Sequence, residues 1–358
     1  MRVMIDIGHP AHVHFFKNFI NSMKSKGHEI KITSRNKEVA LDLLKSFGFA
    51  YENRGEIQTG LYHKAFGMIG IDRTLYHIAR EFQPDILLGF HNPYIAHIAW
   101  LTGKPSIIFT DTENVRIASL LTFPFTNVIC TPSCFRDKIP ENKHIVFNGY
   151  KELAYLHPNH FTPDTDVYSL LGLGKNDPYI ILRFISWAAS HDVGLSGIRK
   201  DSEQEFIKSL ETYGTVFISS ERPLPANLEK YRLTLPPEKM HSVLSFANLY
   251  IGEGGTMAVE AALLGTPAIH IEADAQGQPT GAISGNFTEL RDRYDMMYFY
   301  ADQEAALQKG CELLSDKNLK ESWKKKREYL LSEKWDIAEW MTRFVEEYPA
   351  SFFANRRM

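Results

Sequence analysis

Short apolar runs alternate with longer amphipathic runs along the chain, in two successive sets. The first set predicts strands at residues 2–8, 28–34, 84–90, 105–111, 127–132 and 143–149, with helices at 11–27 and 37–48 among them. The second set predicts strands at 179–186, 215–221, 249–255, 267–272 and 296–301, with helices at 201–214, 238–247 and 257–265 and a helical tail over 303–348. Such repetition is typical of a parallel sheet covered on both faces, so the sequence predicts an α/β protein with two αβα domains.

Residues 149–177 interrupt the alternation with a segment rich in Pro, Asn, Asp and Gly, which we interpret as a linker. A chain of 358 residues also exceeds the size of one ordinary domain. We therefore expect an N-terminal Rossmann-like domain over 1–155 and a C-terminal one over 156–335. Residues 336–358 should form a C-terminal helix that packs back on the first domain. The two domains should face each other across a cleft, because parallel sheets bind ligands at the carboxyl ends of their strands.

Net charge and cysteine content exclude several classes of protein. The formal net charge is −3, which offers no basic field for nucleic acid. The chain has 3 Cys, too few for a disulfide framework, so we expect a reducing compartment. No apolar run approaches the roughly 20 residues that span a bilayer, and the start MRVMIDIGHP predicts a strand and not a signal peptide. We expect a cytoplasmic protein, and contact with the inner membrane surface stays open.

The segment EGGTMAVEAALLGTP, residues 253–267, places two glycines between a predicted strand and a predicted helix. Gly254 and Gly255 would let a ligand approach the backbone, and the free N–H groups of the new helix favour phosphate or diphosphate. Glu260 follows about one and a half helical turns later, where a carboxylate can accept hydrogen bonds from ribose hydroxyl groups. The alternative is a tight turn with a solvated Glu260, because a glycine pair before a helix is a weak signal.

This segment resembles the donor motif in the second domain of GT-B glycosyltransferases, especially that of the N-acetylglucosaminyltransferase that completes the lipid-linked peptidoglycan precursor. The resemblance implies that Gly254, Gly255 and Thr256 face a diphosphate and that Glu260 holds the ribose. Nearly from end to end, the chain also resembles an uncharacterised GT-B-like domain family marked by the start DIGHPAHVHFF and the segment SWAASHD. This second resemblance implies a GT-B architecture and no particular reaction.

The chain is also similar to UDP-N-acetylglucosamine 2-epimerases, which share this architecture. The segment FTDTENVR resembles one of their first-domain motifs and keeps Glu113 and Arg116. Where that family has a strand-end Gly-Asp-Thr, this chain has GFHNP, and SLLTFPFTN lacks the carboxylates of the family's Pro-Glu-Glu segment. Epimerisation at C2 needs acids and bases that remove and return a proton, so we rank an epimerase second. The strand-end loops of the first half supply the other expected cleft residues: His91, Asn92, Asp111 and Arg116.

The loop after the first predicted strand, GHPAHVHFF, contains His9, His12 and His14. An inverting transfer needs a group that takes the proton of the acceptor hydroxyl, and a neutral imidazole suits this task. We favour His12 as the catalytic base because it lies at the helix opening, and His9 and Glu113 are the other candidates. Alternatively, His9 and His12 are helix-cap or loop residues. His14 is expected to pack in the core.

Polar loops also follow the predicted strands of the second domain. In RFISWAASHDVG, the fork of the Arg183 guanidinium suits a diphosphate, whereas a His191–Asp192 pair that only stabilises the loop is the alternative. We expect no metal and no cofactor, since GT-B enzymes generally need none and the one Asp-x-Asp pattern, in DTDV, lies in the linker. These loops supply the remaining expected contacts to a nucleotide sugar: Arg183, Ser186, His191, Asp192, Ser219, Gln276 and Gln278.

Two segments of the first half raise the question of a membrane. Residues 61–82 mix apolar and basic side chains, and SLLTFPFTN contains Phe123 and Phe125. They either contact a lipid-linked acceptor at a membrane surface or form buried core.

The sequence thus predicts a metal-independent GT-B glycosyltransferase that moves a sugar from a nucleotide-sugar donor, UDP-linked, to an acceptor in glycan or glycoconjugate synthesis. The alternatives are an epimerase-like enzyme or a hydrolase acting on a nucleotide sugar, and a non-catalytic sugar-nucleotide-binding protein.

Overall fold

The chain divides into two units, Met1–His160 with Trp335–Met358, and Phe161–Lys334. The computed structural model describes residues 1–36, 38–55, 61–187 and 194–356, with the backbone alone for residues 38 and 61–66. The sequence places the first boundary at residue 155, because it interprets 149–177 as a linker. That interpretation is wrong for the first part of the segment, since α6 (Leu153–Leu156) is buried in the first unit.

The first unit is built on a seven-stranded sheet in which every neighbouring pair is parallel. The strand order is β3-β2-β1-β4-β5-β6-β7. Because both faces of such a sheet are covered, its central strands are almost wholly apolar. The strands are β1 (Arg2–Ile7), β2 (Glu29–Ser34), β3 (Glu52–Asn53), β4 (Ile86–Phe90), β5 (Ser106–Phe109), β6 (Val128–Pro132) and β7 (His144–Phe147).

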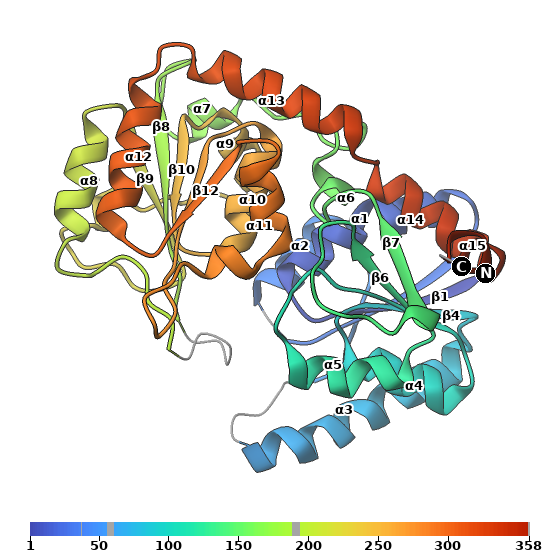
Figure 1. Cartoon of the computed structure of the whole chain (residues 1–358). Coiled ribbons are helices and arrows are strands. Elements are labelled where there is room, and N and C mark those ends of the chain that lie inside the picture. The colour runs from blue at the N-terminus through green and yellow to red at the C-terminus, as the bar shows by residue number, and fades with distance from the viewer. Residues whose placement is uncertain (37, 56–60, 188–193, 357–358) are drawn as a thin grey trace. The chain divides into compact units, whose positions relative to one another are not determined.

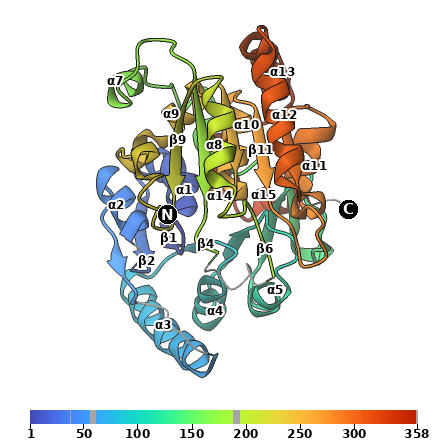
Figure 2. The ribbon, with the colours of Figure 1, turned by 90° about the vertical axis from the view of Figure 1, so that its left-hand side faces the viewer.

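Helices cover both faces of this sheet (Figure 1). One face carries α1 (Pro10–Ser25), α2 (Glu38–Ser46), α6 and α14 (Ile337–Glu346), and the short α15 (Ala350–Asn355) follows. The C-terminal segment therefore belongs to the first unit, where α14 packs on α1 and α6. The other face carries α3 (Leu61–Phe82), α4 (Pro93–Thr102) and α5 (Arg116–Thr122), which Figure 2 shows side by side.

The second unit has a five-stranded parallel sheet in the order β12-β11-β10-β8-β9. Its strands are β8 (Tyr179–Phe184), β9 (Thr215–Ser220), β10 (Leu249–Gly252), β11 (Ala268–Ile271) and β12 (Met297–Tyr300). One face carries α8 (Glu203–Glu211) and α12 (Gln303–Ser315), and the other carries α9 (Met240–Phe246), α10 (Gly255–Leu264) and α11 (Gly285–Asp292) (Figure 1). The remaining helices are α7 (Val167–Leu170) and α13 (Leu319–Glu333). The prediction of two Rossmann-like αβα domains is confirmed.

The strand order reverses once in each sheet. In the first unit the chain runs from β1 to β2 and β3 on one side and then returns to β4 on the other side of β1. In the second unit β9 and β10 flank β8 in the same way. The carboxyl ends of strands at such a reversal leave a crevice where α/β proteins bind ligands. The loops after β1, β4, β8 and β10 are therefore the places to look for function.

Candidate functional site

Glycines shape the turn between β10 and α10 in the second unit. Gly252 has φ 144° and Gly254 has φ 87°, both in the region that favours glycine. A Cβ on Gly252 would lie 2.4 Å from the backbone oxygen of Arg183, and one on Gly254 would lie 3.0 Å from Ile185 Cγ2. Gly254 is also the N-cap of α10, and it has no side chain that could accept from the first-turn N–H groups. The turn thus brings bare backbone to the end of the helix that favours an anion.

Gly255 has a different reason to be glycine. A Cβ at this position would lie 2.7 Å from Cζ of Phe287, a residue of α11. A Cβ here would have to displace the Phe287 ring, so packing between α10 and α11 favours glycine at this position, whatever binds at the turn. A larger residue at position 255 would therefore disturb the fold as well as a ligand, so this position makes a poor probe for a diphosphate.

Arg183, Ser186 and Ser219 lie together at the ends of β8 and β9. The Arg183 guanidinium donates from Nη1 to Ser219 Oγ at 2.8 Å and forms an ion pair with Glu221. The second carboxylate oxygen of Glu221 accepts from the Ser186 backbone N–H at 3.3 Å. Arg183 also borders the glycine turn, because a Cβ on Gly254 would lie 3.9 Å from its Nε. A diphosphate at the turn would meet this guanidinium in competition with Glu221.

Glu253 holds the loop after β8 against the end of β10. Its buried carboxylate accepts from the backbone N–H groups of Ile185 at 2.8 Å and Ile198 at 2.9 Å. Burial raises the pKa of Glu253 to about 7, although these hydrogen bonds oppose the shift. Glu253 was not predicted as a site residue, and its only local signal in the sequence is an acid directly before the glycine pair. His191 and Asp192, predicted in the same loop, lie outside the described residues.

Glu260 is buried, so the alternative of a solvated Glu260 is wrong. Its exposed fraction is 6%, and its Oε1 lies 3.2 Å from His241 Nε2 of α9. Gln276 and Gln278 are exposed on a turn that Asp274 stabilises by accepting from both of their backbone N–H groups. The contacts of Glu260, Gln276 and Gln278 to a nucleotide sugar stay predictions.

His9 and His12 both cap the start of α1 in the first unit. His9 is the N-cap and accepts at Nδ1 from the Ala11 N–H at 3.2 Å, while His12 Nδ1 faces the Gly8 N–H at 3.4 Å. Burial first, and then the charges of His9 and Lys151, hold the pKa of His12 well below its ordinary value. His12 is therefore a neutral imidazole at neutral pH. His14 packs on Phe47 and Tyr155, as predicted.

His91 and Asn92 follow β4 and are tied into the protein. His91 has φ 41°, and its ring nitrogens lie 2.8 Å from Thr110 Oγ1 and 3.3 Å from Ser119 Oγ. Burial lowers its pKa to about 4. Asn92 is buried and caps α4 through its Oδ1, which accepts from the Ile95 N–H at 3.1 Å. Both residues lie at the strand reversal, but the contacts of Asn92 are structural.

Asp111 lies in a buried cluster with Lys151 and Glu152. Lys151 Nζ is 2.5 Å from Asp111 Oδ2 and 2.9 Å from Glu152 Oε1. Lys151 was not predicted as a site residue, because it falls in the segment interpreted as a linker. Glu113 is half-buried just before α5, and Arg116 is the exposed first residue of that helix.

The two segments considered for membrane contact differ in the structure. In α3, Ile71, Leu75, Ala79 and Phe82 belong to the core, as one alternative predicts. Phe123 and Phe125 are half-buried: Phe123 packs on His91, and Phe125 packs on His97 and Trp100. The exposed apolar side chains lie beside them on α4 and α5 and include Trp100, Ile117 and Leu120. In the described part of the chain, no helix has the length and apolar character needed to cross a membrane.

Two parallel αβα units with this order of elements are the architecture of GT-B glycosyltransferases and of UDP-N-acetylglucosamine 2-epimerases. Within this class, the chain belongs to the family described as "Protein of unknown function (DUF354)", whose model matches residues 1–280. The uncharacterized protein MJ0665 of Methanocaldococcus jannaschii is 24% identical over 280 residues, which cover 75% of this chain and 80% of that protein.

Two solved structures are similar over nearly the whole chain. The UDP-GlcNAc 2-epimerase from Neisseria meningitidis bound to UDP-GlcNAc is 13% identical with a TM-score of 0.66, and the match covers 97% of this chain and 100% of that one. The Streptomyces sp. SF2575 glycosyltransferase SsfS6 is 11% identical with a TM-score of 0.59, over 97% and 100% of the two chains. At these identities the likeness establishes the fold, and the GT-B prediction is confirmed at that level.

Proposed function

We propose that the protein is a glycosyltransferase that moves a sugar from a nucleotide-sugar donor, UDP-linked, to an acceptor. The observation that carries this proposal is the turn after β10, where glycine backbone, the first turn of α10 and the Arg183 guanidinium adjoin at a strand reversal. Backbone N–H groups and a guanidinium fork are the donors that a diphosphate prefers. Glu260 then serves the ribose, and Gln276 and Gln278 serve the sugar.

The first unit supplies the acceptor site and the base in this proposal. His12 is half-buried, and burial together with the nearby charge of Lys151 holds its pKa well below the ordinary value, so the ring is neutral. Such a group can accept a proton from a hydroxyl without first losing one of its own. Glu113 is the competing base. No resident metal or cofactor is invoked, because the N–H groups of the first turn of α10 and the Arg183 guanidinium can take up the charge of the leaving nucleoside diphosphate.

A thermal-shift screen against UDP-, GDP-, CDP- and dTDP-sugars tests the donor site. A ligand at 100 times its Kd stabilises the folded protein by roughly 2.7 kcal/mol. We expect the UDP-sugars to raise the Tm most. A screen in which no nucleotide shifts the Tm would remove the basis of the proposal. Free epimer formed from a UDP-sugar without acceptor would instead identify an epimerase, and binding without any turnover would identify a sugar-nucleotide-binding protein.

Glu260→Gln is expected to weaken nucleoside diphosphate binding about tenfold, because it removes the charge that strengthens hydrogen bonds from the ribose. Glutamine keeps an acceptor for His241, so the variant should fold. Calorimetry with UDP measures the affinity. Glu205→Gln on the exposed surface of α8 is the matched control and should bind UDP normally. Equal affinity in both variants would show that Glu260 does not hold the ribose.

The proposal includes a lipid-linked acceptor, because a membrane surface would explain why apolar side chains of α4 and α5 are exposed. Ile117 is 77% exposed and Leu120 is 72% exposed. Ile117→Asp with Leu120→Asp is expected to abolish cosedimentation with anionic phospholipid vesicles, since inserted apolar area drives interfacial binding. Leu170→Asp, at an exposed position of α7 in the second unit, is the control and should sediment like the wild type. Wild-type protein that does not sediment with vesicles would contradict the membrane part of the proposal alone.

A further inference from the structure

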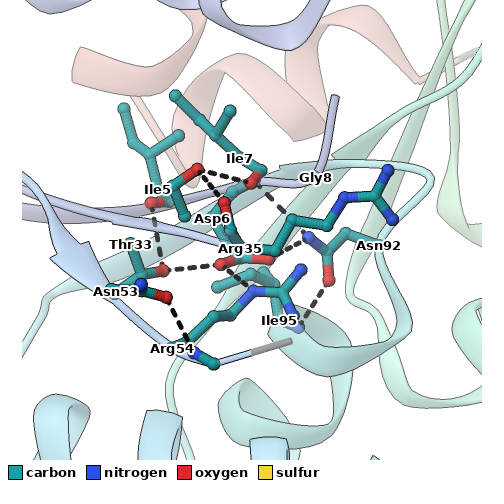
Figure 3. Close-up of polar contacts among 12 residues, drawn as sticks. Ile5, Asp6, Ile7, Gly8, Thr33, Arg35, Asn53, Arg54, Asn92 and Ile95 are labelled. Carbon is teal, nitrogen blue, oxygen red and sulfur yellow. Dashed lines mark hydrogen bonds and ion pairs between the residues drawn. The ribbon is translucent and has the colours of Figure 1, made fainter. Parts of the chain in front are cut away.

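Two arginines end neighbouring strands of the first unit. Strands β2 and β3 pair in parallel with Ser34 opposite Asn53, and Arg35 and Arg54 are the next residue on each strand. They lie beside β1, at the reversal of strand order. Figure 3 shows both side chains extending across the end of β1 toward Asn92. The sequence pattern did not single out these two residues, although Arg35 directly follows β2 and Arg54 directly follows β3.

In the described part of the chain the carboxylate of Asp6 faces this pair, and both of its oxygens already accept hydrogen bonds (Figure 3). Asp6 is fully buried, and its Oδ1 accepts from Thr33 Oγ1 and from Arg54 Nε, each at 2.7 Å. Its Oδ2 accepts from Asn92 Nδ2 at 2.6 Å. Asp6 therefore binds one edge of one guanidinium and leaves the remaining donors of both arginines to other partners.

Buried nitrogens of both arginines have no hydrogen-bond partner within the part of the chain that the structure describes. They are Nη1 of Arg54, a residue that is 3% exposed, and Nε of Arg35, which is half-buried. A buried donor on a charged group is costly to leave unpaired. Among the side chains that the structure describes, the pair carries two positive charges against the single charge of Asp6. Burial and the charge of Arg54 both lower the pKa of Arg35, as expected of a cation short of counter-charge.

The nearby start of α1 does not compete for an anion. Its first residue, Pro10, has no N–H, and the N–H groups of Ala11 and His12 donate to the side chain and the backbone oxygen of His9. An anion at this edge of the sheet would therefore be held by guanidinium groups and not by a helix end. A Cβ on Gly8 would lie 3.9 Å from both Arg54 Nη2 and the His12 ring, so Gly8 borders the arginines and His12 alike.

We propose that Arg35 and Arg54 bind a phosphoryl group of the acceptor, which is therefore a phosphorylated or pyrophosphorylated molecule. The identity of the bound molecule as the acceptor rests on the proposed function, while the anion site itself does not. Two guanidinium groups, one from the end of each strand, offer more donors than the two oxygens of a carboxylate can use, and the oxygens of a tetrahedral phosphoryl group suit them better. A phosphoryl group beside Gly8 also places the acceptor next to His12.

Calorimetric titration of the full-length protein, saturated with UDP to occupy the second unit, tests the site with inorganic phosphate as the probe. Arg35→Gln and Arg54→Lys should each weaken phosphate binding about tenfold or more, the effect of losing a charge-assisted hydrogen bond. Arg54→Lys keeps a cation beside Asp6, and a thermal melt checks that it folds. Arg80→Gln, on the exposed surface of α3, is the matched control and should bind phosphate like the wild type. If Arg54→Lys fails to fold, Arg35→Gln alone decides.

Further probes identify the source of the phosphoryl group. Farnesyl phosphate bound more tightly than glucose 1-phosphate supports a lipid-linked acceptor, and the reverse order supports a soluble sugar phosphate. Farnesol and acetate are the controls that lack the phosphoryl group. Acetate bound as well as phosphate, or phosphate affinity unchanged in both Arg35→Gln and Arg54→Lys, would overturn the proposal. Absence of UDP binding would count against the proposed function only, because the phosphate titration can then be run without nucleotide.

Discussion

Replacing His12 by alanine is expected to lower kcat by about 10²–10⁴-fold and to leave donor affinity nearly unchanged. The variant removes a half-buried neutral imidazole from the first unit, whereas the donor contacts in the proposal belong to the second unit. Single-turnover assays with the UDP-sugar found in the screen would measure the loss, and calorimetry with UDP would measure the affinity. Loss of UDP affinity as large as the loss of kcat would contradict this division of labour.

The hydrogen bond to Gly8 makes the role of His12 open to a sharper test. A neutral imidazole that accepts at Nδ1 carries its proton on Nε2, so in this arrangement Nε2 is a donor and not a base. A base at Nε2 requires that the contact of 3.4 Å with the Gly8 N–H be given up. His12→Gln retains a donor in place of Nε2–H, and it should keep substantial activity only if His12 acts as a donor. Inactivity of both His12→Ala and His12→Gln supports the base.

Glu113→Gln is the companion variant, because Glu113 is the competing base. If Glu113→Gln is inactive while His12→Ala retains turnover, Glu113 becomes the base. The pH profile gives an independent answer. The pKa of His12 lies well below its ordinary value of 6.5, so the ring stays unprotonated as the pH falls through 6.5. We therefore expect kcat to stay level down through that pH, and a fall centred near 6.5 would contradict a base whose pKa is lowered as that of His12 is.

The local parts of the second-unit site could be predicted from the sequence. The turn itself requires a positive φ at Gly254. An apolar run followed by glycines and a helix former predicts such a turn directly. The role of Glu253 could not be predicted, since its partner Ile198 is 55 residues away along the chain. The reason for Gly255 was equally hidden, because it depends on how α11 places Phe287 against α10.

In the first unit the strand pattern predicted the sheet but not which side chains meet at its edge. Asp111 and Lys151 are 40 residues apart, and only the return of the chain after β7 brings them together. Arg35 and Arg54 become neighbours through the pairing of β2 with β3, a strand of two residues that carries no hydrophobic pattern. Long-range pairing of polar residues leaves little periodic signal, whereas burial of apolar faces leaves a strong one.

Lys151→Met is expected to destabilise the protein by about 3–5 kcal/mol, the typical effect of removing one partner from a buried ion pair. Lys151 neutralises Asp111 and Glu152, whose side chains are 3% and 0% exposed. Urea unfolding near pH 8 would measure the loss. Lys138→Met, at an exposed position of the same unit, is the matched control and should unfold like the wild type. Unfolding of Lys151→Met at the wild-type midpoint would show that the cluster is not a stabilising one.

The loss of stability in Lys151→Met should also depend on pH. Burial raises the pKa of Glu152 to about 7, and Lys151 opposes this shift, so without Lys151 the pKa rises further. When a carboxyl has a higher pKa in the folded than in the unfolded protein, the protein loses stability as the pH rises from the unfolded pKa, here 4.5, through the folded pKa. The variant should therefore lose more stability near pH 8 than near pH 5. Adding Glu152→Gln should restore part of the stability lost at the higher pH, because the double variant no longer contains the carboxylate that Lys151→Met leaves without a partner. An equal loss at both pH values, with no recovery in the double variant, would mean that Lys151 acts through packing of its alkyl chain and not through its charge.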